Sequence, residues 1–181
     1  MTADEARAAW ARPLPAAPVV LVTGVAGSGK TTVGRLLGDL LGWDFADADQ
    51  FHPAANIAKM SAGVPLTDAD RTPWLETIAG WIDEHRAAGR PAVVTCSALR
   101  RSYRTLLTEG RPEVLPVFLD GDRALIAERI ARRGDHFFGP AMLDGQFRVL
   151  ERPGPDEHIL VLPVTRPAAD LAALIAAAVL P

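Results

Sequence analysis

The sequence predicts an α/β fold, a three-layer sandwich in which helices cover both faces of a five-stranded parallel sheet. Short, nearly continuous apolar runs alternate along the chain with longer segments whose apolar residues recur at helical spacing. Strands of a parallel sheet are buried on both faces, so they are apolar along most of their length. Because strands alternate with helices, right-handed βαβ connections are expected.

Five short strands are expected. Four of them are nearly continuous apolar runs, and the fifth is shorter. The four runs are residues 19–23, 92–96, 114–119 and 158–162, and the shorter strand lies around residues 43–46.

The expected helices are bounded by residues that favour helix ends. Residues 30–41 carry apolar side chains at helical spacing and stop at Gly42, a favourable C-terminal cap. Thr72 and Pro73 form an N-cap and first-turn pair, which predicts a helix running to about residue 88. The same periodicity predicts helices at residues 122–133 and 167–179, and a short helix is expected to begin near Pro53.

The chain length predicts one domain. The 181 residues are 49% hydrophobic and 23% charged, which is typical of a soluble globular protein. The fold is expected to begin at about residue 18, so that residues 18–181 form a single domain. The Ala/Pro-rich residues 1–17 are expected to form an N-terminal extension, either a poorly ordered arm or a short helix.

Charge and cysteine content exclude several classes of protein. Nineteen basic and twenty-two acidic residues give a net charge of −3, which disfavours binding to nucleic-acid phosphates. The single cysteine, Cys96, cannot form an intrachain disulfide, which favours a reducing compartment. The first twelve residues lack the long apolar region of a signal peptide, and the longest apolar run near the C-terminus is about half the length of a membrane span, so neither export nor membrane insertion is expected. A cytoplasmic location without nucleic-acid or membrane partners is therefore expected.

A phosphate-binding motif follows the first expected strand. Residues 24–31 read Gly-Val-Ala-Gly-Ser-Gly-Lys-Thr, which fits Gly-x-x-x-x-Gly-Lys-Ser/Thr at every defined position and precedes an expected helix. The glycines let backbone N–H groups and the helix N-terminus surround phosphate oxygens. Lys30 is expected to contact the β and γ phosphates of ATP, and the Thr31 hydroxyl to bind Mg²⁺. The expected nucleotide-binding residues are Gly24, Val25, Ala26, Gly27, Ser28, Gly29, Lys30, Thr31 and Thr32.

Two absent patterns narrow the class of nucleotide-binding protein. The sole asparagine, Asn56, is followed by Ile57, so the Asn-Lys-x-Asp pattern by which GTPases recognise guanine is missing. The third expected strand ends in Thr95, Cys96 and Ser97, without the aspartate that commonly helps to hold magnesium. A magnesium carboxylate must therefore come from another segment.

An acidic pair, Asp47 and Asp49, follows the second expected strand. In an extended chain, side chains two residues apart point the same way. The pair lies at the carboxyl edge of the sheet, where the phosphate-binding loop also lies and where open α/β sheets bind ligands. One carboxylate would help hold Mg²⁺, while the other accepts a hydrogen bond from the hydroxyl to be phosphorylated. These residues leave open which of the two is the base.

Several further stretches carry a family resemblance. They are residues 47–52, 56–60, 63–66, 68–75, 96–100, 103–104, 136–138, 142–143, 146–147 and 150–153. Together they resemble the gluconate kinase (gluconokinase) family, whose P-loop kinase fold, with a helical lid, is similar to that of shikimate and nucleoside-monophosphate kinases. The resemblance covers about residues 18–165 and is most specific over 52–75. It implies ATP-dependent phosphorylation of D-gluconate at its terminal (C6) hydroxyl to 6-phospho-D-gluconate, and it allows a homodimer, because such kinases are often dimers.

The acceptor segment offers groups suited to a sugar acid, which needs a cation for its carboxylate and polar groups for its hydroxyls. Arg71, with its bidentate guanidinium, is the first candidate for the carboxylate. Arg104 and Lys59 are the next candidates, and His52 would bond a hydroxyl. Asp49 and Ser97 complete the expected substrate residues.

A lid is expected over about residues 129–140. Arg129 and Arg133 lie four residues apart on one helix and align with the lid arginines of the family, so both are expected to neutralise charge on the transferring phosphoryl group. Arg132 is expected to be solvated, and whether His136 contacts nucleotide stays open. Arg166, after the last strand, is expected near the adenine.

Two other functions remain as alternatives. One is a small-metabolite kinase with a shikimate-like acceptor, which would share the phosphate-binding loop and the lid. The other is a nucleotide-dependent switch without catalysis, which the presence of Lys30, Thr31, Asp47 and Asp49 disfavours. The kinase interpretation requires residues 24–31 and the acidic pair to face one cavity.

Overall fold

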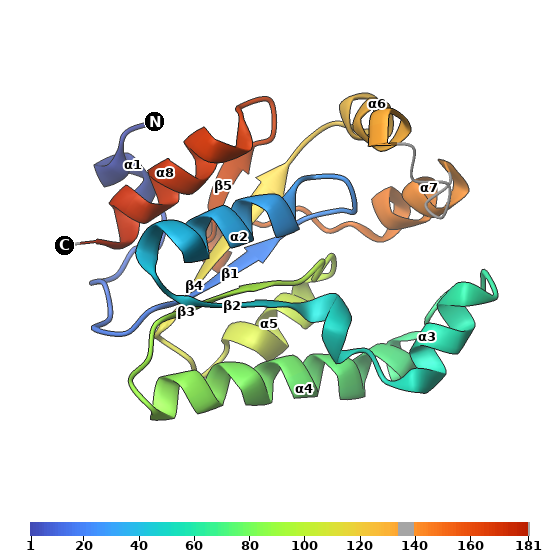
Figure 1. Cartoon of the computed structure of the whole chain (residues 1–181), viewed down its shortest axis with the longest axis horizontal. Coiled ribbons are helices and arrows are strands. Elements are labelled where there is room, and N and C mark those ends of the chain that lie inside the picture. Colours follow the sequence, from blue (N-terminus) through green and yellow to red (C-terminus); the bar gives the residue numbers. More distant parts are fainter. Residues whose placement is uncertain (134–139, 181) are drawn as a thin grey trace.

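The computed structural model, which describes residues 1–133 and 140–180, contains one sheet of five parallel strands in the order β2-β3-β1-β4-β5 (Figure 1). Each strand lies where an apolar run predicts it, with ends shifted by at most two residues, and the parallel α/β sandwich is confirmed. The strands are β1 (Val19–Thr23), β2 (Asp44–Asp47), β3 (Ala92–Thr95), β4 (Val114–Asp120) and β5 (Leu160–Pro163).

Helices cover both faces of this sheet. On one face α1, α2 and α8 pack together, and α4 and α5 cover the other (Figure 1). The helices are α1 (Ala3–Ala8), α2 (Lys30–Leu41), α3 (Ala54–Ser61), α4 (Asp68–Ala87), α5 (Arg101–Thr108), α6 (Arg123–Arg133), α7 (Pro140–Val149) and α8 (Ala168–Val179), with 3₁₀ turns at Ala48–Phe51 and Pro155–Glu157.

Strand β1 divides the core into two layers. Its alternate residues Val20 and Val22 belong to the apolar cluster under α2 and α8, whereas Val19 and Leu21 belong to the cluster under α4. All four side chains are inaccessible to solvent. The period-two alternation of a strand thus places apolar side chains in both layers, which explains the unbroken apolar run.

The N-terminal extension contributes to the first of these layers. Helix α1 is capped by Thr2, and the buried Trp10 that follows it donates from Nε1 to the Pro116 carbonyl at 2.9 Å. Arg7 donates to the Ala178 carbonyl at 3.0 Å, near the end of α8. Of the two structures expected for residues 1–17, the short helix is the one observed.

Helix α4 corrects one sequence prediction, because it begins at Asp68 and not at the Thr72–Pro73 pair. Its N-cap is Thr67, whose hydroxyl accepts from the Asp70 N–H at 3.3 Å, while the Asp70 carboxylate accepts from the Thr67 N–H at 2.9 Å. This capping box satisfies two amides that the start of a helix leaves unpaired. Because the helix begins five residues before Pro73, this proline lies inside the helix and not in its first turn.

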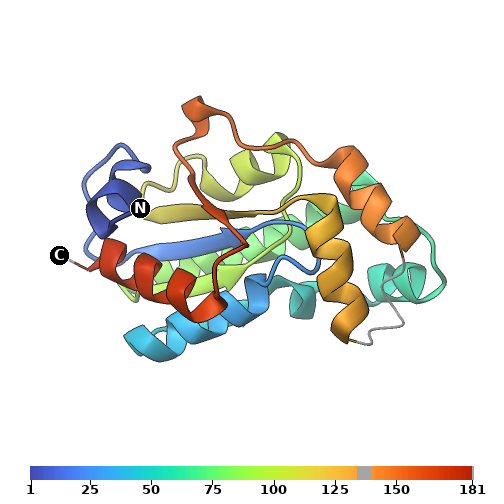
Figure 2. The ribbon, with the colours of Figure 1, turned by 90° about the horizontal axis from the view of Figure 1, so that it is seen from above.

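The carboxyl ends of the strands meet at one end of the molecule. Helices α3, α6 and α7 lie at this end, opposite both termini (Figure 2). Across the sheet, Thr95 of β3 is in register with Asp47 of β2 and with Val22 of β1. The phosphate-binding loop and the acidic pair therefore leave the sheet at the same level, two strands apart. Within the described residues, no helix combines the length and apolar character needed to cross a membrane.

Candidate active site

The phosphate-binding loop requires glycine at two crowded positions. Gly24 has φ +141°, and a Cβ there would lie 2.8 Å from the Leu119 carbonyl oxygen. Gly27 has φ +79°, and a Cβ there would lie 2.7 Å from a side-chain carbon of Ile130 on α6. Both backbone conformations are costly for other residues. The shape of the loop therefore depends on glycine at both positions.

An open cavity of about 270 Å³ lies beside this loop. Five residues predicted to bind nucleotide line it: Ser28, Gly29, Thr32, Arg129 and Arg166. Its remaining lining residues are Val33, Arg132, Pro167, Ala168 and Leu171. The cavity thus brings together the loop, α6 and the start of α8, which is the arrangement expected for a nucleotide site.

The arginines of α6 are fixed differently from one another. Arg129 donates to the Val164 carbonyl, which ties its guanidinium to the segment after β5. Arg132 pairs with Glu128 one turn away and is 78% exposed, as expected for a solvated side chain. The Arg133 side chain and residues 134–139, which include His136, lie outside the described part of the chain.

Lys30 and Thr31 begin α2 at the end of the loop. Lys30 Nζ donates to the Val25 carbonyl at 2.9 Å, so its ammonium group lies over its own loop. The Thr31 hydroxyl donates to Asp47 Oδ2 at 2.6 Å. That hydrogen bond joins the phosphate-binding loop directly to the acidic pair.

The Thr31–Asp47 pair fits a magnesium ion. Mg²⁺ prefers oxygen ligands and is commonly held by one or two protein groups together with phosphates and water. A hydroxyl and a carboxylate whose oxygens lie 2.6 Å apart offer such a pair. Among the described residues, no group of three or more His, Cys, Asp or Glu side chains is placed to hold a metal on its own. The donor set therefore suits an ion completed by a nucleotide.

The prediction that Asp47 and Asp49 point the same way because they lie in one extended segment is wrong. Asp49 does not continue β2 in an extended chain but lies in the 3₁₀ turn Ala48–Phe51. Asp47 caps this turn by accepting from the Asp49 N–H at 3.2 Å through its second carboxylate oxygen. Asp49 itself is exposed, and its carboxylate has no hydrogen-bond or ion-pair partner among the described residues.

Electrostatics show that the donor and acceptor groups are close together. Burial raises the pKa of the Cys96 thiol to about 12, and Lys30, Asp49 and Arg71 all act on this thiol electrostatically. Cys96 directly follows β3, between the two strand ends that carry the loop and the acidic pair. The donor-loop lysine and the two acceptor-segment charges therefore all lie within electrostatic range of the end of β3.

Arg71 and His52 form the inner part of the acceptor region. Arg71 is half-buried, and no hydrogen bond or ion pair joins its guanidinium to another described residue. Burial and the Arg71 charge lower the pKa of His52 against the opposing effect of Asp49, which favours the neutral ring. The ring stacks on Trp74 with centroids 4.2 Å apart, and its Nδ1 lies 3.4 Å from the Asn56 amide nitrogen.

Lys59 is occupied by a structural partner. Its Nζ lies 2.6 Å from Asp70 Oδ1, the carboxylate that completes the capping box of α4. Hydrogen bonds from Lys59 and from Thr67 lower the pKa of Asp70 to about 2. Ser97 lies where predicted, after β3, and its carbonyl accepts from the Gly24 N–H at 3.3 Å.

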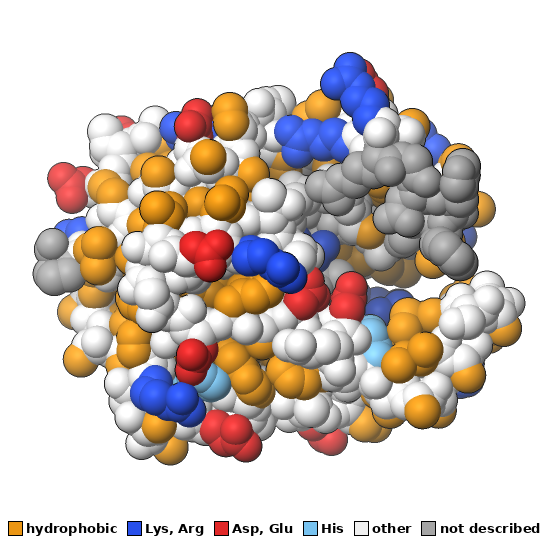
Figure 3. All heavy atoms as spheres, in the orientation of Figure 1, with side chains coloured by type: hydrophobic (Ala, Val, Ile, Leu, Met, Phe, Trp, Pro, Cys, Tyr) orange, Lys and Arg blue, Asp and Glu red, His pale blue; other side chains and the backbone are white. Residues whose placement is uncertain are grey.

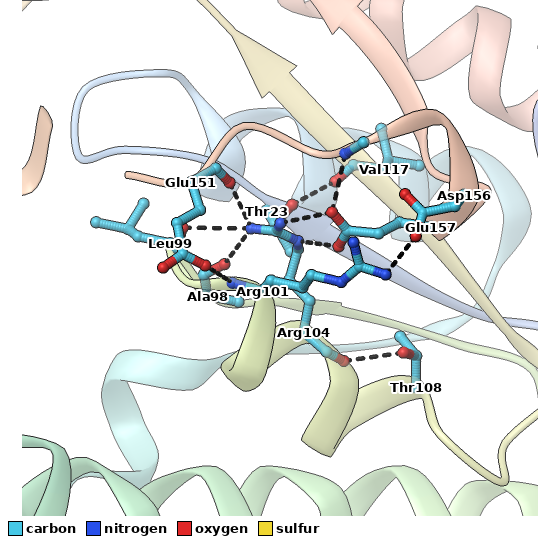
Figure 4. Close-up of polar contacts among 11 residues, drawn as sticks. Thr23, Ala98, Leu99, Arg101, Arg104, Thr108, Val117, Glu151, Asp156 and Glu157 are labelled. Atoms are coloured by element: carbon cyan, nitrogen blue, oxygen red, sulfur yellow. Dashed lines mark hydrogen bonds and ion pairs between the residues drawn. The ribbon is translucent and has the colours of Figure 1, made fainter. Parts of the chain in front are cut away.

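The prediction that Arg104 binds substrate is corrected, because its guanidinium is 98% buried and committed elsewhere (Figure 4). Arg104 forms two parallel bonds to the Glu157 carboxylate, at 2.7 and 2.9 Å. Its third nitrogen donates to the carbonyls of Ala98, Leu99 and Glu151 at 3.3, 3.2 and 2.8 Å. All three nitrogens of the buried guanidinium are thus bound within the protein, so Arg104 holds the fold together and is not placed to bind a substrate carboxylate.

The sequence does not predict that Gln146 contacts the phosphate-binding loop. This residue lies on α7, and its Oε1 accepts from the Ala26 N–H at 2.7 Å. The two residues are 120 positions apart in the chain. No local pattern around Gln146 indicates this proximity, which depends on where the fold places α7.

A hollow is visible at this end of the molecule. In Figure 3 it opens above α3, and acidic, basic and histidine side chains lie together at its inner end. The segments at this edge of the sheet carry side chains of these three kinds: Asp47 and Asp49 at the end of β2, His52 before α3, and Arg71 on α4. A phosphate donor and a small polar acceptor can therefore meet here.

Comparison with known proteins agrees with this arrangement. The family model for shikimate kinase matches residues 26–146. A gluconokinase from Gluconobacter oxydans (strain 621H) is 46% identical over 141 residues, covering 78% of this chain and 79% of the relative. The thermosensitive gluconokinase of Escherichia coli (strain K12) is 43% identical over 141 residues, covering 78% and 75%.

A solved structure agrees in both fold and sequence. The crystal structure of a gluconokinase from Sinorhizobium meliloti 1021 superposes with a TM-score of 0.80 at 40% identity, covering 93% of each chain. The residues matched by the family model, 26–146, include most of the loop, the acidic pair and the acceptor region. The chain therefore belongs to the gluconokinase family, within the shikimate kinase-like P-loop kinases.

Proposed function

We propose that this protein transfers the terminal phosphoryl group of ATP to the C6 hydroxyl of D-gluconate, which gives 6-phospho-D-gluconate and ADP. The observation that carries the proposal is the 2.6 Å hydrogen bond between Thr31 and Asp47, because it joins the donor loop to the acceptor segment. The kinship with gluconokinases indicates which acceptor this segment serves.

The donor would occupy the cavity beside the loop. Its phosphates would accept hydrogen bonds from the backbone amides of residues 24–31 and from Lys30, while Arg166, which lines the same cavity, would contact the base. Thr31 and Asp47 would hold Mg²⁺, which when bound neutralises phosphate charge. Arg129 would add positive charge beside the transferring group.

The two aspartates then have different roles. Asp47 is engaged by Thr31 and by the turn it caps, so we assign it to the metal. Asp49 is the carboxylate without a described partner, so we assign it to the acceptor hydroxyl. The hydroxyl oxygen bonds to the γ-phosphorus as the bond to the β–γ bridging oxygen breaks, and the hydroxyl proton passes to Asp49.

The acceptor would be held by groups around the end of β3. Arg71 suits the gluconate carboxylate, because its half-buried guanidinium offers paired donors. His52 Nδ1 accepts from the Asn56 amide, which leaves the Nε2 proton for a substrate hydroxyl. Ser97 lies between these groups and the loop.

The experiment is a measurement of acceptor-dependent ADP formation. Purified protein with Mg²⁺ and ATP should form ADP when D-gluconate is added, and not with shikimate or a nucleoside monophosphate. We expect Asp49→Asn to reduce kcat by roughly 10²- to 10⁴-fold, because the proton acceptor is removed. Asp39→Asn, on the exposed side of α2, is the matched control and should retain full activity.

Two outcomes would contradict the proposal. ADP formation with shikimate or a nucleoside monophosphate, but not with gluconate, would show that the acceptor is different. If the protein binds nucleotide but turns over no acceptor, and if Asp49→Asn does not change that binding, the protein would be a nucleotide-dependent switch without catalysis.

A further inference from the structure

The contact between Gln146 and Ala26 involves one of the loop's own phosphate-binding groups. Backbone N–H groups of such loops are the donors that phosphate oxygens normally accept from. Here the Ala26 N–H donates to Gln146 Oε1 at 2.7 Å. A neutral amide oxygen therefore satisfies a hydrogen-bond donor that the loop presents to phosphate.

Ala26 lies in the chain between the part of the loop that lines the nucleotide cavity and the part that contacts the acceptor side. Ser28 and Gly29, later in the loop, line the nucleotide cavity together with Arg166. Gly24, before it, donates to the carbonyl of Ser97 on the acceptor side. A nucleotide whose base lies near Arg166 would extend its phosphates toward Ala26, so the terminal phosphate is the one nearest to Gln146.

Gln146 is held in this position by the packing of its helix. On α7, Leu143 is fully buried in the core and Phe147 packs against the same cluster. The segment after α7 is fixed as well, because Glu151 donates from its N–H to the Leu99 carbonyl at 2.9 Å and accepts from the Arg101 N–H at 2.7 Å.

Arg104 also holds the segment after α7 in place. Its guanidinium donates to the Glu151 carbonyl and binds the Glu157 carboxylate (Figure 4). Because α7 is anchored at its core face and at its C-terminal end, the Gln146 amide is positioned at the loop by rigid structure.

We propose that Gln146 is a further phosphate-binding residue of this site, which recognises the terminal phosphoryl group of the nucleotide. The proposal rests on the proposed function, since it concerns the same donor site. A primary amide carries both an acceptor and two donors. With phosphate in the loop, the Ala26 N–H donates to a phosphate oxygen, and the Gln146 side chain rotates so that its NH₂ group donates to the same phosphate.

The test compares nucleotides that differ only in the terminal phosphate. Binding of ADP and of an ATP analogue with a non-hydrolysable β–γ linkage is measured by calorimetry, with Mg²⁺ and without acceptor. In Gln146→Glu the carboxylate retains the Ala26 contact and repels phosphate, so we expect binding of the analogue to weaken about tenfold or more, with ADP changed less than about twofold. Gln146→Leu, which lacks the amide, should weaken the analogue about three- to tenfold with the same selectivity.

The matched control is Arg148→Gln, an exposed position on the same helix that faces no site described above. It should bind both nucleotides as the native protein does. Equal weakening of ADP and the analogue, or no weakening of either, would overturn the proposal. Thermal melting of each variant shows whether it is folded. Since these measurements use no acceptor, they stand or fall separately from the gluconate assay on the native protein.

Discussion

Arg71 and Arg104 show how differently two arginines of one chain can be used. Both follow the strands that form the acceptor edge, and both are plausible carboxylate ligands by type and position. Arg104 is buried, and each of its three guanidinium nitrogens donates to Glu157 or to backbone carbonyls. Arg71 is half-buried without a partner among the described residues. Of these two arginines, Arg71 is therefore the one whose guanidinium is available to an acidic ligand.

Replacing Arg71 should therefore affect the acceptor alone. We expect Arg71→Lys to raise the KM for gluconate about 10- to 100-fold, because lysine cannot form two parallel bonds to a carboxylate. The KM for ATP should change little, and steady-state kinetics with each substrate varied in turn would measure both. Arg90→Lys, beyond the far end of α4, is the control. A rise in the KM for ATP equal to that for gluconate would contradict the assignment.

The individual site residues were predictable from sequence where a motif fixes them. The loop from Gly24 to Thr31 lies where its pattern places it, since the motif itself dictates the backbone. Partners distant in sequence were not predictable. Neither the pairing of Arg104 with Glu157 nor the contact of Gln146 with Ala26 follows from neighbouring residues, because both depend on where the fold places α7 and the segment that follows it.

At the scale of elements, α3 and the start of α4 form one hydrogen-bonded unit. Lys59 on α3 pairs with Asp70, and Asn56 donates to the Asp70 carbonyl at 2.9 Å. Asp70 thus serves the N-terminus of α4 and the packing of α3 against it. Because His52 and Arg71 lie at either side of this unit, its geometry sets the spacing of the acceptor groups.

The unit should lose stability in acid. The pKa of Asp70 lies at about 2, below its ordinary 3.8, so the ionised form stabilises the fold. That stabilisation is complete above about pH 5 and is lost as the pH falls through 4 toward 2. The difference in Tm between the native protein and Asp70→Asn should therefore be largest near neutrality and shrink below pH 4.

Thermal melts between pH 2.5 and 7 would measure this difference. Lys59→Met removes the main cause of the lowered pKa, so it should reduce the pH dependence without abolishing it, since the Thr67 contacts remain. A Tm difference that stays constant across this pH range would contradict the role given to Asp70.

Elements were predicted well in their interiors and less well at their ends. The strands and α2 follow from apolar patterning, which burial enforces. The start of α4 was misplaced because Thr72 and Pro73 resemble a helix start, whereas the reciprocal bonds of Thr67 and Asp70 satisfy more backbone donors. Similarly, the turn after Asp47 replaced the extended chain expected for Asp49, because the Asp47 carboxylate caps that turn.

At the scale of the molecule, the Arg104–Glu157 pair joins segments that are far apart in the chain. It fixes the loop after β3 to the segment between α7 and β5, and it holds Ala98, a buried residue with φ +38°. Such a backbone conformation is unfavourable for a residue with a side chain and needs support from its surroundings. The pair therefore stabilises the backbone next to Ser97.

Breaking this pair should destabilise the whole protein. We expect Arg104→Met to lower the free energy of unfolding by about 3–5 kcal/mol, because it leaves the Glu157 carboxylate buried without a counter-charge. Adding Glu157→Leu to that variant should recover part of the loss, which chemical denaturation would measure. Arg101→Met, which removes an exposed pair with Asp156 from the same helix, should cost no more than about 1 kcal/mol. A loss in Arg104→Met as small as that in Arg101→Met would contradict the structural role of the pair.

The order of the strands has a consequence for how substrate preference is encoded. Since β3 separates β1 from β2, the rigid sheet sets the span between the donor loop and Asp47 at two inter-strand spacings, roughly 10 Å. Asp49, His52 and Arg71 all belong to the single uninterrupted stretch that connects β2 to β3. That stretch is a self-contained cassette: exchanging it between related kinases would alter the molecule that receives the phosphate while leaving the machinery that delivers it in place.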